Sequence, residues 1–238
     1  MIPGALLDTV KPVTIVCGHY GVGKTNFSVN LACDLSAMGK SVTLIDLDIV
    51  NPYFRASEQR ELLEQHGVRL IAPVFAERGT SLDVPSLTGA IIPAIDSAND
   101  DAITVIDVGG DDVGATALGR FSSKIVEGQY AMLCVLNRFR NLVQDPEDAL
   151  QNLREIEVAS HVKATALVDN AHLKGDTTAR TIERGMEYAQ EVSRLSGLPI
   201  VCVTVPETLG NEEAAKVSQH IDDSLNYAVR MFVRNPWE

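Results

Sequence analysis

The chain has 238 residues, a formal net charge of −12 and 45% hydrophobic residues. This hydrophobic share is typical of a globular protein and excludes a disordered one, and no apolar run approaches the roughly 20 residues of a membrane-spanning helix. Because binding to DNA phosphates requires a basic surface, the acidic charge argues against DNA, and we expect a cytoplasmic protein that binds neither DNA nor a membrane.

A glycine-rich segment comes first in chain order. After a short tail, the β-branched run Val13–Cys17 predicts a strand, and the pattern from Lys24 to Gly39 predicts a helix. Between them, residues 18–25 read GHYGVGKT and match the phosphate-binding pattern GxxxxGK[ST]. The position between a strand and a helix favours a phosphate-binding loop (P-loop) over an ordinary glycine-rich turn.

The residue types of this segment suit the phosphates of a nucleotide. Glycines allow the backbone to curl so that its N–H groups surround the β-phosphate at the helix N-terminus. We expect Lys24 to reach the β- and γ-phosphate oxygens and Thr25 to ligate Mg²⁺. The predicted nucleotide-binding residues of the segment are Gly18, Gly21, Val22, Gly23, Lys24, Thr25 and Asn26.

A second predicted strand, residues 41–45, leads into Asp46 and Asp48. In a parallel sheet, ligands bind at the carboxyl ends of the strands, so at least one of these carboxylates should reach the phosphates. Asp48 is further into the loop, and we expect it to polarise the attacking water or to hold the metal. The alternative is a pair of solvated loop carboxylates.

The fourth predicted strand, residues 102–106, runs into Asp107-Val108-Gly109-Gly110. An aspartate at this place has the form of a Walker B residue, which holds Mg²⁺ through a water while the N–H of Gly110 approaches the γ-phosphate. The alternative is an aspartate that caps an ordinary strand-to-loop turn.

Strand and helix patterns alternate along the rest of the chain. The other predicted strands are residues 68–72, 130–136, 163–168 and 200–205, and the other predicted helices are 57–65, 85–97, 115–126, a helix from Pro146 with Asp145 as N-cap, 177–195 and a region from Asn211. Residues 225–233 have helical spacing, which favours a helix packed on the core over one on a membrane surface.

Apolar strands separated by helices predict an α/β fold. We expect one domain over residues 1–238, a P-loop NTPase with a mostly parallel sheet of about seven strands and helices on both faces. The four cysteines stand singly in apolar runs, which predicts buried thiols rather than a disulfide or metal framework.

These features together resemble the MinD/ParA/nitrogenase-iron-protein class of P-loop ATPases, the deviant Walker A or SIMIBI proteins, most specifically over Cys17–Arg55. The resemblance implies that Asp48 is the switch I carboxylate, that Gly109–Gly119 is switch II and that the protein forms ATP-dependent dimers. It also implies that Asn170 contacts the base and that Pro206 lines the base pocket, although both also suit turns. The sequence has no Asn-Lys-x-Asp run, which argues against the guanine-specific subclass.

The sequence departs from this class at one important position. The signature lysine of the class, which reaches across a dimer to the partner's nucleotide, is replaced by His19, and the next position carries Tyr20. Histidine is shorter and mostly neutral near pH 7, so it does not supply the same fixed charge. Arg55 is a candidate to replace it, but it can equally pair with Glu58 or Glu61.

The predicted function is a Mg²⁺-ATP-binding switch that hydrolyses ATP and couples it to homodimerisation or to an unidentified protein partner. The predicted catalytic residues are Lys24 and Asp48, and the predicted metal ligands are Thr25, Asp48 and Asp107. Two alternatives stay open: an ATP-dependent small-molecule ligase or synthase on the same scaffold, and a nucleotide-binding regulator without hydrolysis.

Overall fold

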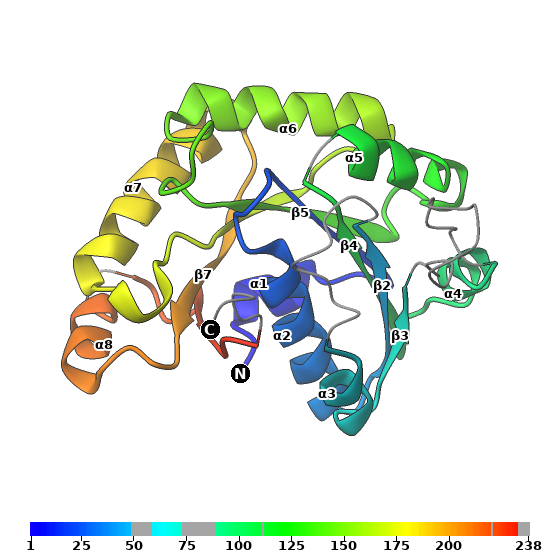
Figure 1. Ribbon diagram of the computed structural model, residues 1–238, viewed down its shortest axis with the longest axis horizontal. Helices are drawn as coiled ribbons and strands as arrows, with labels where there is room; N and C mark the ends of the chain where they lie inside the picture. The colour runs from blue at the N-terminus through cyan, green and yellow to red at the C-terminus, as the bar shows by residue number, and fades with distance from the viewer. Residues whose placement is uncertain (49–58, 73–88, 111, 220, 233–238) are drawn as a thin grey trace, which may run out of the picture.

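The computed structural model describes residues 1–48, 59–72, 89–110, 112–219 and 221–232 (Figure 1). Arg55 and the turn predicted at Asn51-Pro52 lie outside these residues. Eight strands form one sheet, in which every pair of neighbouring strands is parallel. The strands are β1 (Val13–Cys17), β2 (Ser41–Leu47), β3 (Val68–Ile71), β4 (Ala102–Val108), β5 (Tyr130–Leu136), β6 (Ala166–Asp169), β7 (Ile200–Pro206) and β8 (Asn226–Val229).

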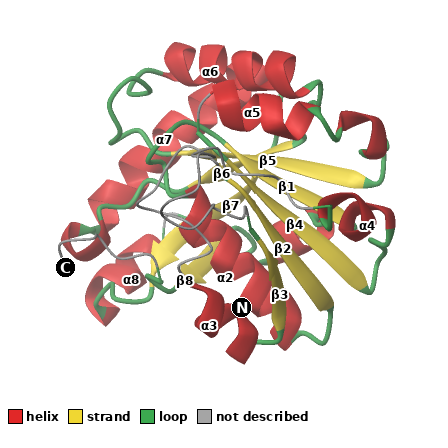
Figure 2. Cartoon of the chain, turned by 45° about the vertical axis from the view of Figure 1, so that its right-hand side comes forward, coloured by secondary structure: helices red, strands yellow, loops and turns green. Residues whose placement is uncertain are grey.

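Helices cover both faces of this sheet. They are α1 (Gly4–Thr9), α2 (Lys24–Ala37), α3 (Arg60–Gln65), α4 (Ile91–Asp96), α5 (Asp112–Gly119), α6 (Pro146–Ser160), α7 (Ala179–Ser196) and α8 (Asn211–Val217), with 3₁₀ turns η2 (Ser122–Lys124) and η3 (Lys174–Asp176). Figures 1 and 2 show α2 and α3 on one face and α5 and α6 on the other. In the described part of the chain, no helix has the length and apolar character needed to cross a membrane.

The two faces of the sheet bury the two largest apolar clusters of the described residues, and a smaller third cluster lies between α7, β7 and α8. Val16 and Leu44 pack with residues of α1 and α2, whereas their neighbours Ile15 and Ile45 pack with residues of α5, α6 and α7. Because successive side chains of a strand point to opposite faces, a strand covered on both sides must be apolar throughout. This explains why the strands appear in the sequence as continuous apolar runs.

The strand order β3-β2-β4-β1-β5-β6-β7-β8 places the end of β1 at a switch point of the fold. The chain leaves β1 for β2 across a gap that β4 later fills, and β5 then continues on the other side of β1. Ligands of such sheets bind at this crevice, outside the carboxyl ends of the strands. Asp107 of β4 is in register with Val16 of β1 and with Asp46 of β2, so these ends meet at one edge.

The structure confirms the α/β class and the predicted strands 13–17 and 130–136, and it confirms Asp145 as N-cap and Pro146 as first residue of α6. It differs at several boundaries. The sheet has an eighth strand, β2, β4 and β6 extend to residues 47, 108 and 169, and β7 includes Pro206. The helix predicted over 115–126 ends at Gly119, and a short helix, α1, precedes β1.

The helix predicted over residues 225–233 is wrong in its described part, because residues 226–229 form β8 beside β7. Tyr227 and Val229 are buried while Ala228 between them is exposed, which is the alternation of a strand. Tyr227 packs edge-on against Phe27 of α2, and its hydroxyl donates to Asp34 at 3.1 Å. The spacing of apolar residues in this segment is compatible with a helix and with a strand. Pairing with β7 stabilises the strand.

Candidate nucleotide-binding site

The loop between β1 and α2 has the backbone that its glycines predict. Gly18, Gly21 and Gly23 have φ values of 137°, 77° and 96°, in the region that favours glycine. A Cβ at Gly18 would lie 2.4 Å from the carbonyl oxygen of Val135, which leaves no room for a side chain. Gly23 is the N-cap of α2 and Lys24 its first residue, so the helix directs its N-terminal N–H groups to this loop.

Lys24 is buried between the P-loop and the end of β4. Its Nζ donates to the carbonyl oxygen of His19 at 3.0 Å, and a Cβ at Gly110 would lie 2.7 Å from the same Nζ. Burial lowers the pKa of Lys24 below its ordinary value, and the negative charges of Asp107 and Asp48 oppose this effect. Lys24 and both aspartates are therefore close enough to interact electrostatically.

Asp107 has the surroundings of a carboxylate that can hold a cation. It is 1% exposed, its Oδ1 accepts from Ser28 at 3.1 Å, and its Oδ2 has no hydrogen-bond partner within the described residues. Burial and the charge of Asp46 raise the pKa of Asp107 to about 7, while Lys24 and a hydrogen bond from Thr25 oppose the shift. The predicted metal ligands Thr25 and Asp107 thus lie within hydrogen-bonding distance.

These groups fit Mg²⁺ bound together with a nucleotide. No cluster of three or more histidine, cysteine, aspartate or glutamate ligands exists in the described ranges. Mg²⁺ commonly uses only one or two protein carboxylates and takes its other oxygens from phosphates and water. The Thr25 hydroxyl and the unpartnered Oδ2 of Asp107 match that pattern better than a metal held by protein alone.

Asp46 and Asp48 are both buried, so they are not a pair of solvated loop carboxylates. The Oδ1 of Asp46 accepts from the N–H of Asp48 at 3.0 Å, which fixes the turn after β2. The place of Asp48 beside Lys24 is compatible with the predicted role in preparing water, which stays a prediction.

Three other predicted residues contact the protein itself. Asn26 donates to the carbonyl oxygen of Arg230 and accepts from the N–H of Phe232, so it anchors the segment after β8. Asn170, directly after β6, binds the P-loop, and Pro206, the last residue of β7, pairs with Val229. The contacts predicted between these residues and a nucleotide stay predictions.

The model of the CobQ/CobB/MinD/ParA nucleotide binding domain (CbiA) matches residues 13–178, which is more than half of the chain. The chain belongs to this family. The predicted resemblance to the MinD/ParA class is therefore confirmed at the level of the family, and the P-loop belongs to a nucleotide-binding domain. No curated protein matches the chain at a significant level.

Solved structures support the same fold for this CbiA-family domain. FtsY from Mycoplasma mycoides has a TM-score of 0.53 and 17% identity over 81% of this chain and 59% of its own. Chloroplast FtsY from Physcomitrella patens has a TM-score of 0.56 and 18% identity, with 90% and 70% covered. The signal recognition particle 54 kDa protein from Aeropyrum pernix K1, in complex with GDP, has a TM-score of 0.51 and 15% identity, with 85% and 42% covered. At these identities the likeness shows the fold alone, and the chain spans less than two thirds of the first and third proteins.

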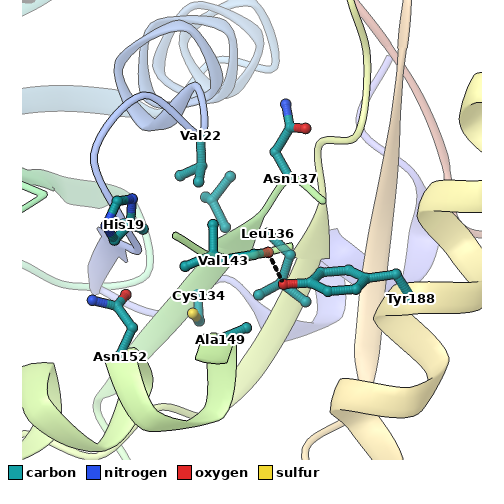
Figure 3. A pocket seen from close by; sticks show the side chains of 10 residues that line it. His19, Val22, Cys134, Leu136, Asn137, Val143, Ala149, Asn152 and Tyr188 are labelled. Carbon is teal, nitrogen blue, oxygen red and sulfur yellow. Dashed lines mark hydrogen bonds between the residues drawn. The ribbon is translucent and has the colours of Figure 1, made fainter. Parts of the chain in front are cut away.

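The outer side of the P-loop forms one wall of a small pocket. In Figure 3, His19 and Val22 lie on one side of it and Tyr188 of α7 on the other. The hydroxyl of Tyr188 donates to the carbonyl oxygen of Val143 at 2.6 Å, which closes the far end. The Nδ1 of His19 lies 3.1 Å from the carbonyl oxygen of Tyr20.

Arg140 is a cation at the loop that sequence reasoning missed. Its Cδ would lie 3.9 Å from a Cβ at Gly21, so the side chain runs alongside the P-loop. It belongs to the turn after β5, where the N–H of Arg140 donates to the carbonyl oxygen of Asn137. The signal was available: Arg138 and Arg140 directly follow a predicted strand whose carboxyl end had to lie beside β1.

Asp169, the last residue of β6, is a further buried carboxylate. Its Oδ1 accepts from the N–H of Ala171 at 3.0 Å, and its Oδ2 has no partner within the described residues. Burial raises the pKa of Asp169 to about 7, and the Ala171 N–H only partly opposes this shift. The folded chain therefore keeps a proton that the unfolded chain releases near pH 4.

We expect Asp169→Asn to change how stability depends on pH. Because the folded pKa lies above the unfolded one, the wild type should lose stability as pH rises from about 4 to about 7, at up to ~1.4 kcal/mol per pH unit from this group. Asp169→Asn should lack this part of the slope. Urea unfolding at several pH values in that window measures it, with Asp101→Asn, whose side chain is 93% exposed, as the control. Equal slopes in Asp169→Asn and the wild type would contradict the expectation.

Proposed function

We propose that this protein is a Mg²⁺-dependent ATP-binding switch that hydrolyses ATP and couples the bound state to dimerisation or to a protein partner. The observation that carries the proposal is the convergence of Lys24, Thr25 and Asp107 at the carboxyl edge of the sheet, beside a glycine loop. A triphosphate supplies the negative charge that Lys24 and the helix N-terminus would stabilise.

The chain's own residues divide the work in this proposal. The backbone N–H groups of the P-loop bind the phosphates, and Lys24 exchanges its contact with the His19 carbonyl for phosphate oxygens. Thr25 and Asp107 would hold Mg²⁺, which would supply positive charge to the phosphate oxygens. Asp48 orients the attacking water and accepts its proton.

The choice of ATP over GTP rests on the sequence, which contains no Asn-Lys-x-Asp run. A structural neighbour binds GDP, so both nucleotides belong in the test. We expect calorimetry to give at least about tenfold tighter binding of ATP than of GTP in the presence of Mg²⁺. Light scattering should show the mass of a dimer with ATP and of a monomer with ADP. Tighter binding of GTP would overturn the choice of nucleotide, and an unchanged mass would overturn the dimer.

A second candidate is an ATP-dependent ligase or synthase that activates a small acid. The family description is compatible with it, because that description names a nucleotide binding domain and no activity. Such an enzyme should release ADP only when its acid substrate is present. A screen of carboxylic acids for stimulated ADP release separates it from a switch, whose turnover depends on protein concentration instead.

The third candidate, a nucleotide-binding regulator without hydrolysis, is favoured by His19, which does not supply the charge of a signature lysine. Prolonged incubation with ATP and Mg²⁺ separates it from the switch. No ADP at protein concentrations that permit dimerisation would support the regulator and overturn the proposed hydrolysis.

A further inference from the structure

The P-loop has few charges of its own for a ligand as negative as a triphosphate. Residues 18–25 contain a single lysine or arginine, Lys24, and a single histidine, His19. A histidine is mostly neutral near pH 7, whereas a triphosphate bound with Mg²⁺ keeps a net negative charge. Any second fixed cation at the loop therefore comes from another segment of the chain.

The turn after β5 brings such a cation to the loop. β1 and β5 are in register up to Cys17 and Cys134, so the segments that follow these two strands start side by side. Asn137 fixes the turn, because its Oδ1 accepts from the N–H of Phe139 at 3.0 Å and its carbonyl oxygen accepts from the N–H of Arg140 at 3.2 Å. Asn137 is buried, so these contacts are shielded from water. The backbone of the turn is thereby held in place up to Arg140.

The side chain of Arg140 lies alongside the P-loop at Gly21. A Cβ at Gly21 would be 3.9 Å from Cδ and 4.0 Å from Nε of Arg140, which is ordinary van der Waals contact. The guanidinium group begins at Nε, so the charged end of the side chain is at the loop as well as its aliphatic stem. Gly21 lies between Gly18 and Lys24, in the part of the loop whose N–H groups suit phosphates.

The two arginines of this turn differ in their contacts. Arg140 is exposed, and its guanidinium makes no hydrogen bond or ion pair with any residue that the structure describes. By contrast, Nη1 of Arg138 donates to the carbonyl oxygen of Arg184 at 3.1 Å. The guanidinium of Arg138 also lies 5.8 Å from the ring centroid of Phe139 and 6.0 Å from that of Tyr188. Arg138 is therefore engaged with α7, and Arg140 is available to a ligand of the loop.

The guanidinium of Arg140 has the chemistry that phosphate oxygens require. It is always charged, and its N–H donors form a planar fork that matches two oxygens of one phosphate. Phosphate oxygens that accept from loop N–H groups lie about 3 Å from the nitrogen atoms, so they come close to a guanidinium that already lies alongside the loop. The alternative is a surface arginine that only water surrounds.

We propose that Arg140 is a second phosphate-binding cation, which binds phosphate oxygens of the nucleotide in the P-loop of its own chain. The inference rests on the proposed function in that the loop must bind phosphates. It requires no second copy of the chain, because Arg140 and Gly21 lie together within one chain. It therefore differs from a cation that reaches the nucleotide across a dimer.

The test measures the affinities for MgATP and for Mg²⁺-tripolyphosphate, which has no base or ribose, by calorimetry. We expect Arg140→Ala to weaken both by about tenfold. Arg140→Lys keeps the charge but loses the fork, so its affinities should lie between those of Arg140→Ala and the wild type. Dilute guanidinium chloride should restore part of the affinity of Arg140→Ala, and sodium chloride at the same concentration should not.

Arg138→Ala is the matched control, because it removes the same charge from the same turn while its guanidinium faces α7. We expect its affinities to stay within about threefold of the wild type, since salt screens charges that do not touch the ligand. An equal loss in Arg138→Ala and Arg140→Ala would overturn the inference, because the effect would then belong to the general charge of the turn. Circular dichroism and thermal unfolding show which variants are folded, and Arg140→Gln carries the test if Arg140→Ala is not.

The remaining outcomes separate the inference from the proposed function. Wild-type affinities for both ligands in a folded Arg140→Ala or Arg140→Gln variant would identify a hydrated surface arginine and overturn the inference alone. A loss that arises only at protein concentrations at which light scattering shows a dimer would overturn the assignment of Arg140 to the nucleotide of its own chain. A wild-type protein that binds neither ligand would overturn the inference and the proposed function together.

Discussion

Lys24→Ala is expected to weaken ATP binding by at least about tenfold, because a charge-assisted hydrogen bond is worth about 1.5–3 kcal/mol. Lys24 is a buried cation of the loop, and its Nζ donates to the neutral carbonyl oxygen of His19. A negatively charged phosphate oxygen in place of this carbonyl forms a charge-assisted hydrogen bond with the ammonium group, which is stronger than a bond to a neutral acceptor. Calorimetry with MgATP measures the loss.

Lys40→Ala is the control for this change. Lys40 follows α2 at the opposite edge of the sheet and pairs with the exposed carboxylate of Asp101, so its removal takes away the same charge at a distance from the loop. We expect its ATP affinity to stay within about twofold of the wild type, since exposed ion pairs contribute little and distant charges are screened. Equal affinities of Lys24→Ala and Lys40→Ala would remove Lys24 from the site.

The sequence predicts the P-loop well because its determinants are local. Gly18, Gly21 and Gly23 take backbone angles that other residues rarely adopt, and their spacing before Lys24 leaves few alternatives. The edge of the sheet that carries the site is also predictable. The carboxyl ends of parallel strands lie at one edge, so polar residues that end several strands lie together there. This rule alone predicts that Asp107, at the end of its strand, lies near Thr25.

The features that escaped sequence reasoning depend on contacts between distant segments. Asn170 and Val22 are 148 positions apart, and no periodic pattern links an asparagine after β6 to a carbonyl in the P-loop. Ser28, which hydrogen-bonds Asp107, lies one helical turn after Thr25 and is recognised only when β4 is placed beside α2. The segment of β8 likewise forms a strand because it pairs with β7, and this pairing is not visible in the sequence.

The buried charges near the loop suit a ligand that carries both positive and negative charge. Asp46 and Asp107 are strand neighbours, and the charge of Asp46 raises the pKa of Asp107. Lys24 compensates part of this negative charge, but burial disfavours the charged form of Lys24 and lowers its pKa. Mg²⁺ bound with a triphosphate adds positive charge next to Asp107 and negative charge next to Lys24, so each group obtains an opposite partner at the same time.

Asp48→Asn is expected to reduce ATP turnover by about 100-fold or more, since general base catalysis commonly contributes that much. Asparagine keeps the size of the side chain but accepts no proton, so binding and hydrolysis should separate. We expect the affinity for MgATP to stay within about threefold, because the lost attraction to Lys24 is offset by reduced repulsion of the phosphates. Single-turnover ADP formation at saturating MgATP measures the chemical step.

Asp101→Asn is the matched control for Asp48→Asn, because it makes the same isosteric change at the opposite edge of the sheet on a side chain that is 93% exposed. Its turnover should equal that of the wild type. If Asp48→Asn also keeps wild-type turnover, Asp48 is not the base, and the water must be oriented by another group at the phosphate edge. If instead turnover and affinity fall together, Asp48 acts through the ground-state complex, as a residue that holds the metal does.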